Sequence, residues 1–445
     1  MNYTPHTEED IERALQAIGV PSVDALFAEI PEELLDPSID LPRGMDEVSL
    51  LARVKELSDA NAGASSLMGG GLKKHFIPTV TQHLTFQSEF VTAYTPYQPE
   101  VSQGILQATF EFQTMMSELT GLPVSNASMY DGASAVAEAA LLAVRQTGRN
   151  QIIVSQGAHP ETREVLATYL NALGIELTSN ALNGRLVSSR SDIGNDVAAV
   201  IVQQPNFLGY LEDMETLAQD AHVAGALFIS VVDPFSLGIL RPPGSYGADV
   251  AVGDGQTIGN SLSFGGPHFG FMVVTEALLR QLPGRIVGQT IDVDGRRAFV
   301  LTLQAREQHI RRARAKSNIC SNHQLTALMA TVNLSALGPR GLQEVATASV
   351  AAAHALADDL ASAGYRVRSE SHFFNEFVVE LASPAREVVR KLAKQGISAG
   401  VPVPAHYGLG SALLLAATEL TGEQERRELM ETLQRVAPVS TSVAR

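Results

Sequence analysis

The sequence predicts an α/β fold around a mainly parallel sheet, and three observations indicate it. Short, nearly continuous apolar runs alternate with helical stretches in the middle of the chain, as strands covered on both faces require. The first sixty residues read as small helices. The part beyond about residue 330 reads as a second, smaller α+β domain. Because 445 residues, 45% of them hydrophobic, exceed one compact unit, we expect a helical arm (1–65), a large α/β domain (66–335) and a small α+β domain (336–445).

The arm contains signals for two short helices. Thr7 and Asp10 form a T-x-x-D capping box, and the apolar stripe that follows ends at Gly19. Ser22 can begin a second helix, which ends before Pro31. An arm this small must pack its apolar stripes on something, either its own chain or a partner subunit.

The large domain follows a helix and strand pattern. Helical spacing over 105–119 ends at Gly121, and an alanine-rich helix over 133–145 ends at Gly148. Two more helices are predicted over 161–173 and 214–224. The expected strands are 152–154, 198–202, 227–232, 250–252 and 271–274.

The small domain begins within a long alanine-rich helical stretch that starts near residue 330. A strand over 377–381 and a helix over 387–394 follow, and then a proline-broken VPVP segment. The pair Gly338-Pro339 marks the neighbourhood of the domain boundary.

Composition excludes several classes of function. The net charge of −16 repels nucleic acid and anionic membranes over most of the surface. The single cysteine, Cys320, excludes an internal disulfide and fits a reducing compartment, so we expect a cytoplasmic protein. The polar start of the chain carries no export signal, no apolar run is long enough to span a bilayer, and no metal site is predicted.

One region looks like the large domain of an aminotransferase-type enzyme, which predicts pyridoxal-phosphate fold type I. Asp233 ends an apolar strand where a carboxylate would pair with a pyridinium nitrogen, and a glycine-rich hairpin follows. The cofactor aldehyde needs a lysine amine, but Thr257 lies 24 residues after Asp233, and 233–315 contains no lysine. Either the cofactor is absent or the lysine comes from another chain.

Two further loops could line such a pocket. Ser128 lies in the NASMYDG loop before a helix whose N–H groups could cradle a phosphate, although Asp131 could equally cap the same groups. His159 follows a strand where fold relatives stack a ring on the pyridine, and its alternative is a structural role.

Two other segments are dense in polar and charged groups. The proline-pinned TAYTPYQPE stretch suits a contact surface, although it could simply be solvated; its candidates are Tyr94, Thr95, Tyr97, Gln98 and Glu100. The stretch 306–316 holds five cations, among them Arg311 and Arg312. These cations could form a solvated helix face, or could bind a carboxylate, a phosphate or an acidic partner.

These segments resemble the glycine decarboxylase family, the P-proteins of the glycine cleavage system. The resemblance runs from about Leu67 to the C-terminus; its most specific blocks are YTPYQPEVSQG and REQHIRR, with NASMYDGAS, VGDGQTIG, FGGPHFGF and QLPGRIVG in support. The chain is similar to the N-terminal half, which some bacteria make as a separate subunit 1. In that family the lysine that binds pyridoxal phosphate belongs to the C-terminal half or subunit 2.

The resemblance implies decarboxylation of glycine, with transfer of the aminomethyl carbon to the lipoyl arm of the H-protein. The implied partners are subunit 2, lipoylated H-protein and, functionally, the aminomethyltransferase (T-protein) and the dihydrolipoyl dehydrogenase (L-protein). Subunit 1 would contribute to a site whose cofactor is bound by subunit 2, with Tyr94 and Tyr97 as its catalytic candidates.

Two alternatives stay open. The chain could be a self-sufficient pyridoxal-phosphate enzyme that uses Lys316, although that residue lies 83 positions after Asp233 in an arginine-rich stretch. It could also be a non-catalytic scaffold that positions subunit 2 and the H-protein.

Overall fold

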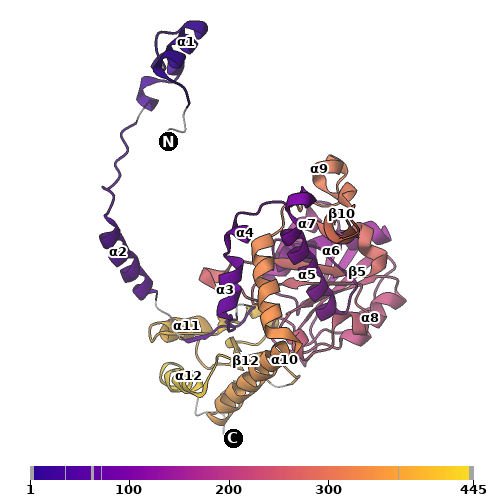
Figure 1. Ribbon diagram of the computed structural model, residues 1–445. Coiled ribbons are helices and arrows are strands. Elements are labelled where there is room, and N and C mark those ends of the chain that lie inside the picture. The colour runs from indigo at the N-terminus through magenta and orange to yellow at the C-terminus, as the bar shows by residue number, and fades with distance from the viewer. Residues whose placement is uncertain (1–4, 36, 62–64, 72, 369, 440–445) are drawn as a thin grey trace. The chain divides into compact units, whose positions relative to one another are not determined.

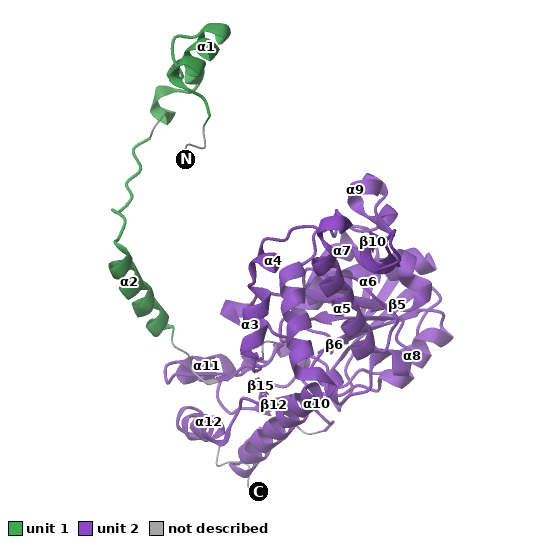
Figure 2. Cartoon of the chain, viewed as in Figure 1, with its two compact units in different colours: residues 1–62 green, residues 63–445 purple. Residues whose placement is uncertain are grey.

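The computed structural model describes residues 5–35, 37–61, 65–71, 73–368 and 370–439. The chain divides into two compact units, residues 1–62 and residues 63–445 (Figure 2). The arm was expected to end at residue 65, close to this division. Residues 62–64, which lie between, are outside the described part.

The first unit is helical, as the sequence predicts. Helix α1 (Glu8–Ile18) starts at the predicted capping box and ends at Gly19, whose φ of 84° is in the left-handed region. Helix α2 (Glu47–Ala60) is capped by Asp46. The predicted second helix is a short 3-10 helix, Asp24–Phe27, and another follows at Glu32–Leu34. None of the residues of α1 and α2 is buried.

The second unit contains a seven-stranded sheet in the order β2-β8-β7-β6-β5-β3-β4. Figure 1 shows the strands of this unit surrounded by helices. Strands β3 to β7 pair in parallel, and β8 and β2 join antiparallel. All five predicted strands are present. The bounds are β2 Val124–Ser125, β3 Gln151–Ser155, β4 Glu176–Asn180, β5 Val197–Gln204, β6 Leu227–Val232, β7 Val250–Asp254 and β8 Gly270–Val274.

Helices cover both faces of this sheet because its strands send alternate side chains to opposite sides. Val250 and Val252 of β7 pack with α6 (Gly132–Thr147) and α7 (Pro160–Asn171). Ala251, between them, packs with α5 (Gln103–Thr120) and the first part of α10 (Gln324–Ser362). Helix α8 (Met214–Val223) packs beside Val200 and Phe228. The sheet is therefore a buried middle layer.

The C-terminal part of this unit builds a smaller antiparallel sheet in the order β11-β12-β15-β14. Its strands are β11 Arg366–Val367, β12 Glu376–Glu380, β14 Val401–Pro402 and β15 Ala412–Ala416, accompanied by α11 Ala385–Ala393 and α12 Glu423–Val436. Helix α10 breaks at Gly338, with φ 62°, before Pro339. Strand β1 (Ser65–Leu67) pairs in parallel with β13 (Ile397–Ala399), so the start of this unit lies against its end.

The remaining elements are short helices and one two-stranded ribbon in the segments that connect these parts of the chain. Helices α3 (Thr79–Thr85) and α4 (Ser88–Val91) precede the YTPYQPE segment, and β9 (Ile286–Ile291) pairs antiparallel with β10 (Arg297–Thr302). The cationic stretch forms only the four-residue helix α9 (Gln308–Arg311) between 3-10 turns. Short 3-10 helices lie at Pro99–Val101, Ser236–Gly238, Pro243–Tyr246, Ser263–Gly265, Glu276–Gln281, Gln304–Arg306, Arg312–Arg314 and Ala405–Tyr407. Among the described residues, no helix is both long and apolar enough to cross a membrane.

Candidate functional site

Asp233 begins the loop that leaves the carboxyl end of β6, the edge of a parallel sheet where ligands of α/β proteins bind. Its carboxylate is already paired. The ammonium of Lys73 contacts Asp233 Oδ2 and lies 3.3 Å from Glu376 Oε2. The three side chains are 4%, 15% and 9% exposed, for Lys73, Asp233 and Glu376 respectively. The other Asp233 oxygen accepts from the Phe235 N–H at 2.9 Å.

The charges of this triad stabilise one another. Burial alone would lower the pKa of Lys73, but the two carboxylates outweigh it and hold that pKa above its usual value. Burial alone would raise the pKa of Asp233, but the Lys73 ammonium holds it below the usual range. Lys73 is therefore a cation, paired with an ionised Asp233.

The loop that carries Lys73 is anchored at two more points. Glu376 Oε1 accepts from the N–H groups of Gly70 at 2.6 Å and Gly71 at 3.3 Å. The Gly70 carbonyl lies 3.2 Å from His159 Nε2. Since Glu376 belongs to β12, this loop joins the small sheet to the edge of the large one.

His159 is fully engaged within the chain. Its Nδ1 accepts from the Glu161 N–H at 3.2 Å, which caps α7, so Nε2 carries the proton that it donates to Gly70. The ring lies edge-on to Phe207, with centroids 5.0 Å apart. The imidazole is thus held in the orientation that caps α7, which is the structural role expected as its alternative.

Carboxylates occupy the start of α6. Sequence analysis expected either a phosphate-binding site here or a helix cap by Asp131. Asp131 caps the helix by accepting from the Ser134 N–H at 2.7 Å. Asp254, at the end of β7, accepts from the Gly132 N–H at 3.0 Å, and its Cβ would lie 2.9 Å from a Cβ at Gly132. Ser128 is buried, and its hydroxyl accepts from the side-chain amide of Asn322 at 2.7 Å.

Thr257 is buried beside these loops and has no amine. Its hydroxyl has no hydrogen-bond partner within the described residues. A pyridoxal-phosphate site would need a free carboxylate for the pyridinium, free N–H groups for the phosphate and an amine for the aldehyde. Asp233 is paired, the start of α6 is capped, and the segment has no lysine. The residues of this pocket therefore do not fit the cofactor.

A second cluster joins the two motif blocks that sequence analysis singled out. The Tyr97 hydroxyl accepts from an Arg285 guanidinium N–H at 3.3 Å, and the guanidinium carbon lies 5.4 Å from the Tyr97 ring centre. His309 meets the same ring edge-on, with centroids 5.8 Å apart. Tyr97 is half-exposed, at 50%, and its hydroxyl is held by a buried cation.

Glu307 extends this cluster below the surface. It is buried, and its Oε2 lies 3.8 Å from His309 Nδ1. Burial raises the pKa of Glu307, and the charges of His309, Arg285 and Arg306 oppose the rise. Arg285 Nε and Glu307 Oε1 are buried and make no hydrogen bond in the described part of the chain.

The other predicted contact residues lie at the surface around this cluster. Tyr94 is 79% exposed, Gln98 and Glu100 are exposed, and Thr95 is partly buried. The exposed Arg311 bonds through Nε to the Ala305 carbonyl, and Arg312 is exposed. Lys316 donates to the Gln281 side chain. The structure thus brings Tyr97 to the cationic stretch, while Ser128, His159, Asp233 and Thr257 belong to the loops at the sheet edge.

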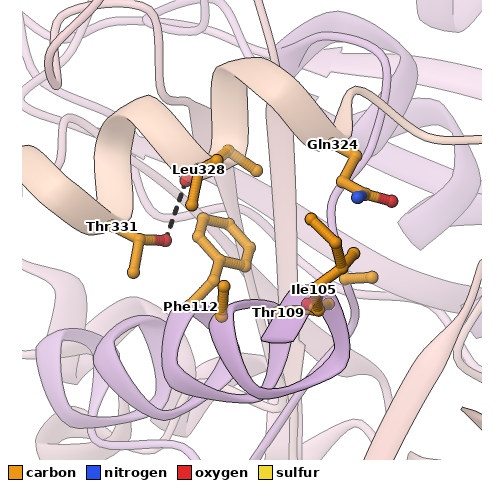
Figure 3. Close-up of a pocket in the computed structure, with 9 residues that line it drawn as sticks. Ile105, Thr109, Phe112, Gln324, Leu328 and Thr331 are labelled. Carbon is orange, nitrogen blue, oxygen red and sulfur yellow. Dashed lines mark hydrogen bonds between the residues drawn. The ribbon is translucent and has the colours of Figure 1, made fainter. Parts of the chain in front are cut away.

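A small hollow between α5 and α10 is a packing feature. Figure 3 shows Ile105 and Phe112 of α5 facing Leu328 and Thr331 of α10, with the Thr331 hydroxyl bonded to the Ala327 carbonyl at 2.9 Å. Its volume of about 10 Å³ admits at most one water molecule. None of the candidate residues lines it.

Sequence analysis missed Lys73, Glu376 and Arg285. A buried strand-end aspartate requires a cation, and the lysine pair of GGGLKKH, pinned by glycines, was a usable signal. Glu376 and Arg285 gave no local signal, because each contacts partners far away in the sequence.

The comparisons with known proteins agree on one family. A family model described as glycine cleavage system P-protein matches residues 1–433, so the match includes the arm that lies before the motif blocks. "Probable glycine dehydrogenase (decarboxylating) subunit 1" of Geotalea daltonii is 47% identical over 440 residues, covering 98% of this chain and 99% of its own.

Solved structures extend the likeness to the fold. An inhibitor-bound crystal structure of glycine decarboxylase (P-protein) of the glycine cleavage system has a TM-score of 0.90 and 53% identity, covering 98% of this chain and 100% of its own. Lactobacillus brevis glutamate decarboxylase, at 13% identity, has a TM-score of 0.67 over 93% of this chain and 98% of its own, and shows the fold alone. The predicted fold type I architecture is confirmed.

Proposed function

Because this chain belongs to the P-protein family of the glycine cleavage system, we propose that it is subunit 1 of a two-chain glycine decarboxylase. With subunit 2, it would decarboxylate glycine and pass the aminomethyl group to lipoylated H-protein. The observation that carries the proposal is the missing Schiff-base lysine: Thr257 stands where that lysine is needed, residues 233–315 contain no lysine, and the Lys73 ammonium nearby is paired with Asp233. Pyridoxal phosphate would be bound covalently by subunit 2.

The proposed reaction balances without a further reactant. The carboxyl carbon of glycine leaves as carbon dioxide, and the electron pair of the broken carbon–carbon bond forms a bond from the remaining carbon to one sulfur of the lipoyl disulfide. The other sulfur keeps the electron pair of the broken sulfur–sulfur bond and takes up the proton that glycine loses, so it becomes a thiol. The cofactor, when bound to subunit 2, supplies the electron sink for the decarboxylation. This chain supplies shape, orientation and charge.

Tyr97 is the residue best placed for that role. Its side chain is half-exposed, and its hydroxyl accepts from the buried Arg285, so the phenol is held in a defined orientation. Tyr94 is more exposed and would be covered by subunit 2. Thr95, Gln98 and Glu100 would form the rim of the contact.

The first test asks which chain carries the cofactor. Each chain and their complex are incubated with pyridoxal phosphate, reduced with borohydride and mapped by peptide mass. We expect a stoichiometric adduct on subunit 2 and none on this chain. A stoichiometric adduct on Lys316 would support the self-sufficient enzyme instead, although Lys316 is engaged with Gln281.

The second test asks whether the pair is active. The co-purified chains should exchange carbon dioxide with glycine only when lipoylated H-protein is present, and neither chain alone should do so. The scaffold alternative predicts that no side chain of this subunit affects turnover once the complex has formed. The T-protein and L-protein would act downstream. The exposed free thiol of Cys320 supports a reducing, cytoplasmic setting.

A further inference from the structure

The Asp233 pocket of this chain is closed from within. We propose that Lys73 takes the place of a pyridinium nitrogen on Asp233 and ties the large sheet to the small one. The pocket would therefore bind no pyridoxal phosphate even without a covalent bond. Each pair of subunits would then hold one cofactor.

Charge makes the closure effective. Asp233 and Glu376 share one ammonium in a buried site, so an incoming pyridinium would meet a second cation. Lys73 would first have to leave, and the pair of carboxylates would lose a cation that burial makes hard to replace. A ring that binds without a covalent bond gains too little free energy to displace the Lys73 ammonium.

The phosphate end is closed independently. The Gly132 N–H is bonded to Asp254, and the Ser134 N–H is bonded to Asp131. A phosphate at the start of α6 would meet two carboxylates instead of free donors. The two ends of a cofactor would thus be rejected by different residues.

The closing loop also has a mechanical role. Lys73 and the N–H groups of Gly70 and Gly71 bind Glu376 of β12, and Lys73 binds Asp233 at the end of β6. One short loop therefore clamps two sheets. A subunit that only supplies a wall to a neighbouring site benefits from a fixed arrangement.

The binding test uses pyridoxine 5′-phosphate, which has the ring nitrogen and phosphate of the cofactor but no aldehyde. Equilibrium dialysis of the purified wild-type chain should show no saturable binding up to millimolar concentration. Alkaline release from the two-chain complex should give one pyridoxal phosphate per pair. Saturable micromolar binding to this chain alone, or two cofactors per pair, would overturn the proposal.

The clamp is tested by removing its charges. Lys73→Met should lower the melting temperature by several degrees, because it leaves two buried carboxylates unpaired. The triple variant Lys73→Met/Asp233→Asn/Glu376→Gln should recover most of the loss. The matched control is Lys74→Met, since Lys74 is the exposed neighbour and should melt like the wild type. Equal melting of the Lys73 and Lys74 variants would overturn the clamp.

A measurement on the unaltered chain covers the case in which Lys73→Met fails to fold. Hydrogen exchange at the Gly70 and Gly71 amides should be strongly protected, because both are bonded to Glu376. Unprotected exchange at both amides would rule out the clamp. Both the dialysis and this measurement use the chain alone, so they keep their meaning if it fails to associate with subunit 2.

Discussion

Tyr97 shows how the hydroxyl of a half-exposed side chain acquires a fixed direction. Pro96 is buried and anchors the segment, and the Tyr97 N–H bonds back to the Thr95 carbonyl at 2.8 Å. Arg285 then holds the phenol from the protein side. The residue therefore combines a half-exposed side chain with a hydroxyl that a buried cation holds in place.

We expect Tyr97→Phe, and to a lesser degree Tyr94→Phe, to lower turnover in the two-chain enzyme. Loss of a hydrogen bond made chiefly in the transition state lowers turnover about 10- to 100-fold, or ~1.4–2.7 kcal/mol. Complex formation and cofactor content should stay unchanged. Steady-state carbon dioxide exchange measures the effect.

Tyr365→Phe is the matched control, because its hydroxyl also loses one hydrogen bond, to the Ala437 carbonyl, outside the cluster. Full activity of Tyr94→Phe, Tyr97→Phe and the double variant would exclude the hydroxyls as contributors and favour the scaffold. Activity lost only together with complex formation would make the segment an interface.

Glu212 predicts a pH dependence of stability. Burial raises its pKa to about 7, although Asn206 and Ser188 donate hydrogen bonds to its oxygens. The folded-state pKa lies above the unfolded one, so the stabilisation is complete below the unfolded pKa and is lost as pH rises through about 7. Between pH 5 and 8 the wild type should lose up to ~3 kcal/mol from this group.

Thermal unfolding of wild type and Glu212→Gln across that range measures the effect. The Gln variant should show a flatter profile, because its side chain does not titrate. Parallel profiles of the two proteins would show that Glu212 stays ionised throughout.

At the scale of elements, the cationic stretch 306–316 forms short helical turns and no long helix. Its helix α9 covers only four residues and ends at Arg311, and both Arg311 and the following Arg312 are exposed. Two exposed cations in a chain of net charge −16 form a local exception to the overall field.

We expect Arg311→Gln/Arg312→Gln to raise the Michaelis constant for H-protein more at low salt than at high salt. The Debye length near ~10 Å at 0.1 M screens such steering, so the ratio of variant to wild type should approach one at high salt. Arg340→Gln is the control, since Arg340 is an exposed cation on α10. A ratio independent of salt would indicate an internal or structural role for the pair.

At the scale of the whole molecule, we propose that residues 66–335 and 336–445 are the large and small domains, after an arm of residues 1–65. The break of α10 at Gly338 and the separate antiparallel sheet support this division. The clamp at Lys73 would connect the two proposed domains, because Lys73 binds Asp233 beside the large sheet and Glu376 in the small sheet.

Co-expression with subunit 2 should give a stable complex. The segment that leads to the candidate cluster exposes Phe76, Phe86, Val91, Tyr94 and Val101, and an obligate interface typically buries more than ~2,000 Å². Size-exclusion chromatography with light scattering at micromolar concentration measures the association. Separate migration of the two chains would contradict the proposed assembly.

Local signals predicted the elements of the fold well. Helix α1 follows from Thr7, Asp10 and Gly19, and β6 has the predicted bounds, because capping and apolar runs act over a few residues. The strands that were not predicted include β2, β4, β9 and β10. These four are short or partly polar, and pairing with a neighbouring strand decides them.

The sequence by itself determined the fold class, the family resemblance and the absence of a lysine from residues 233–315, because each depends on residue type and short-range order. Only the tertiary structure decided what Asp233 and Tyr97 touch. Lys73 and Asp233 are 160 positions apart, and Tyr97 and Arg285 are 188 apart. Contacts at such separations depend on how the chain folds back on itself, and no local pattern encodes them.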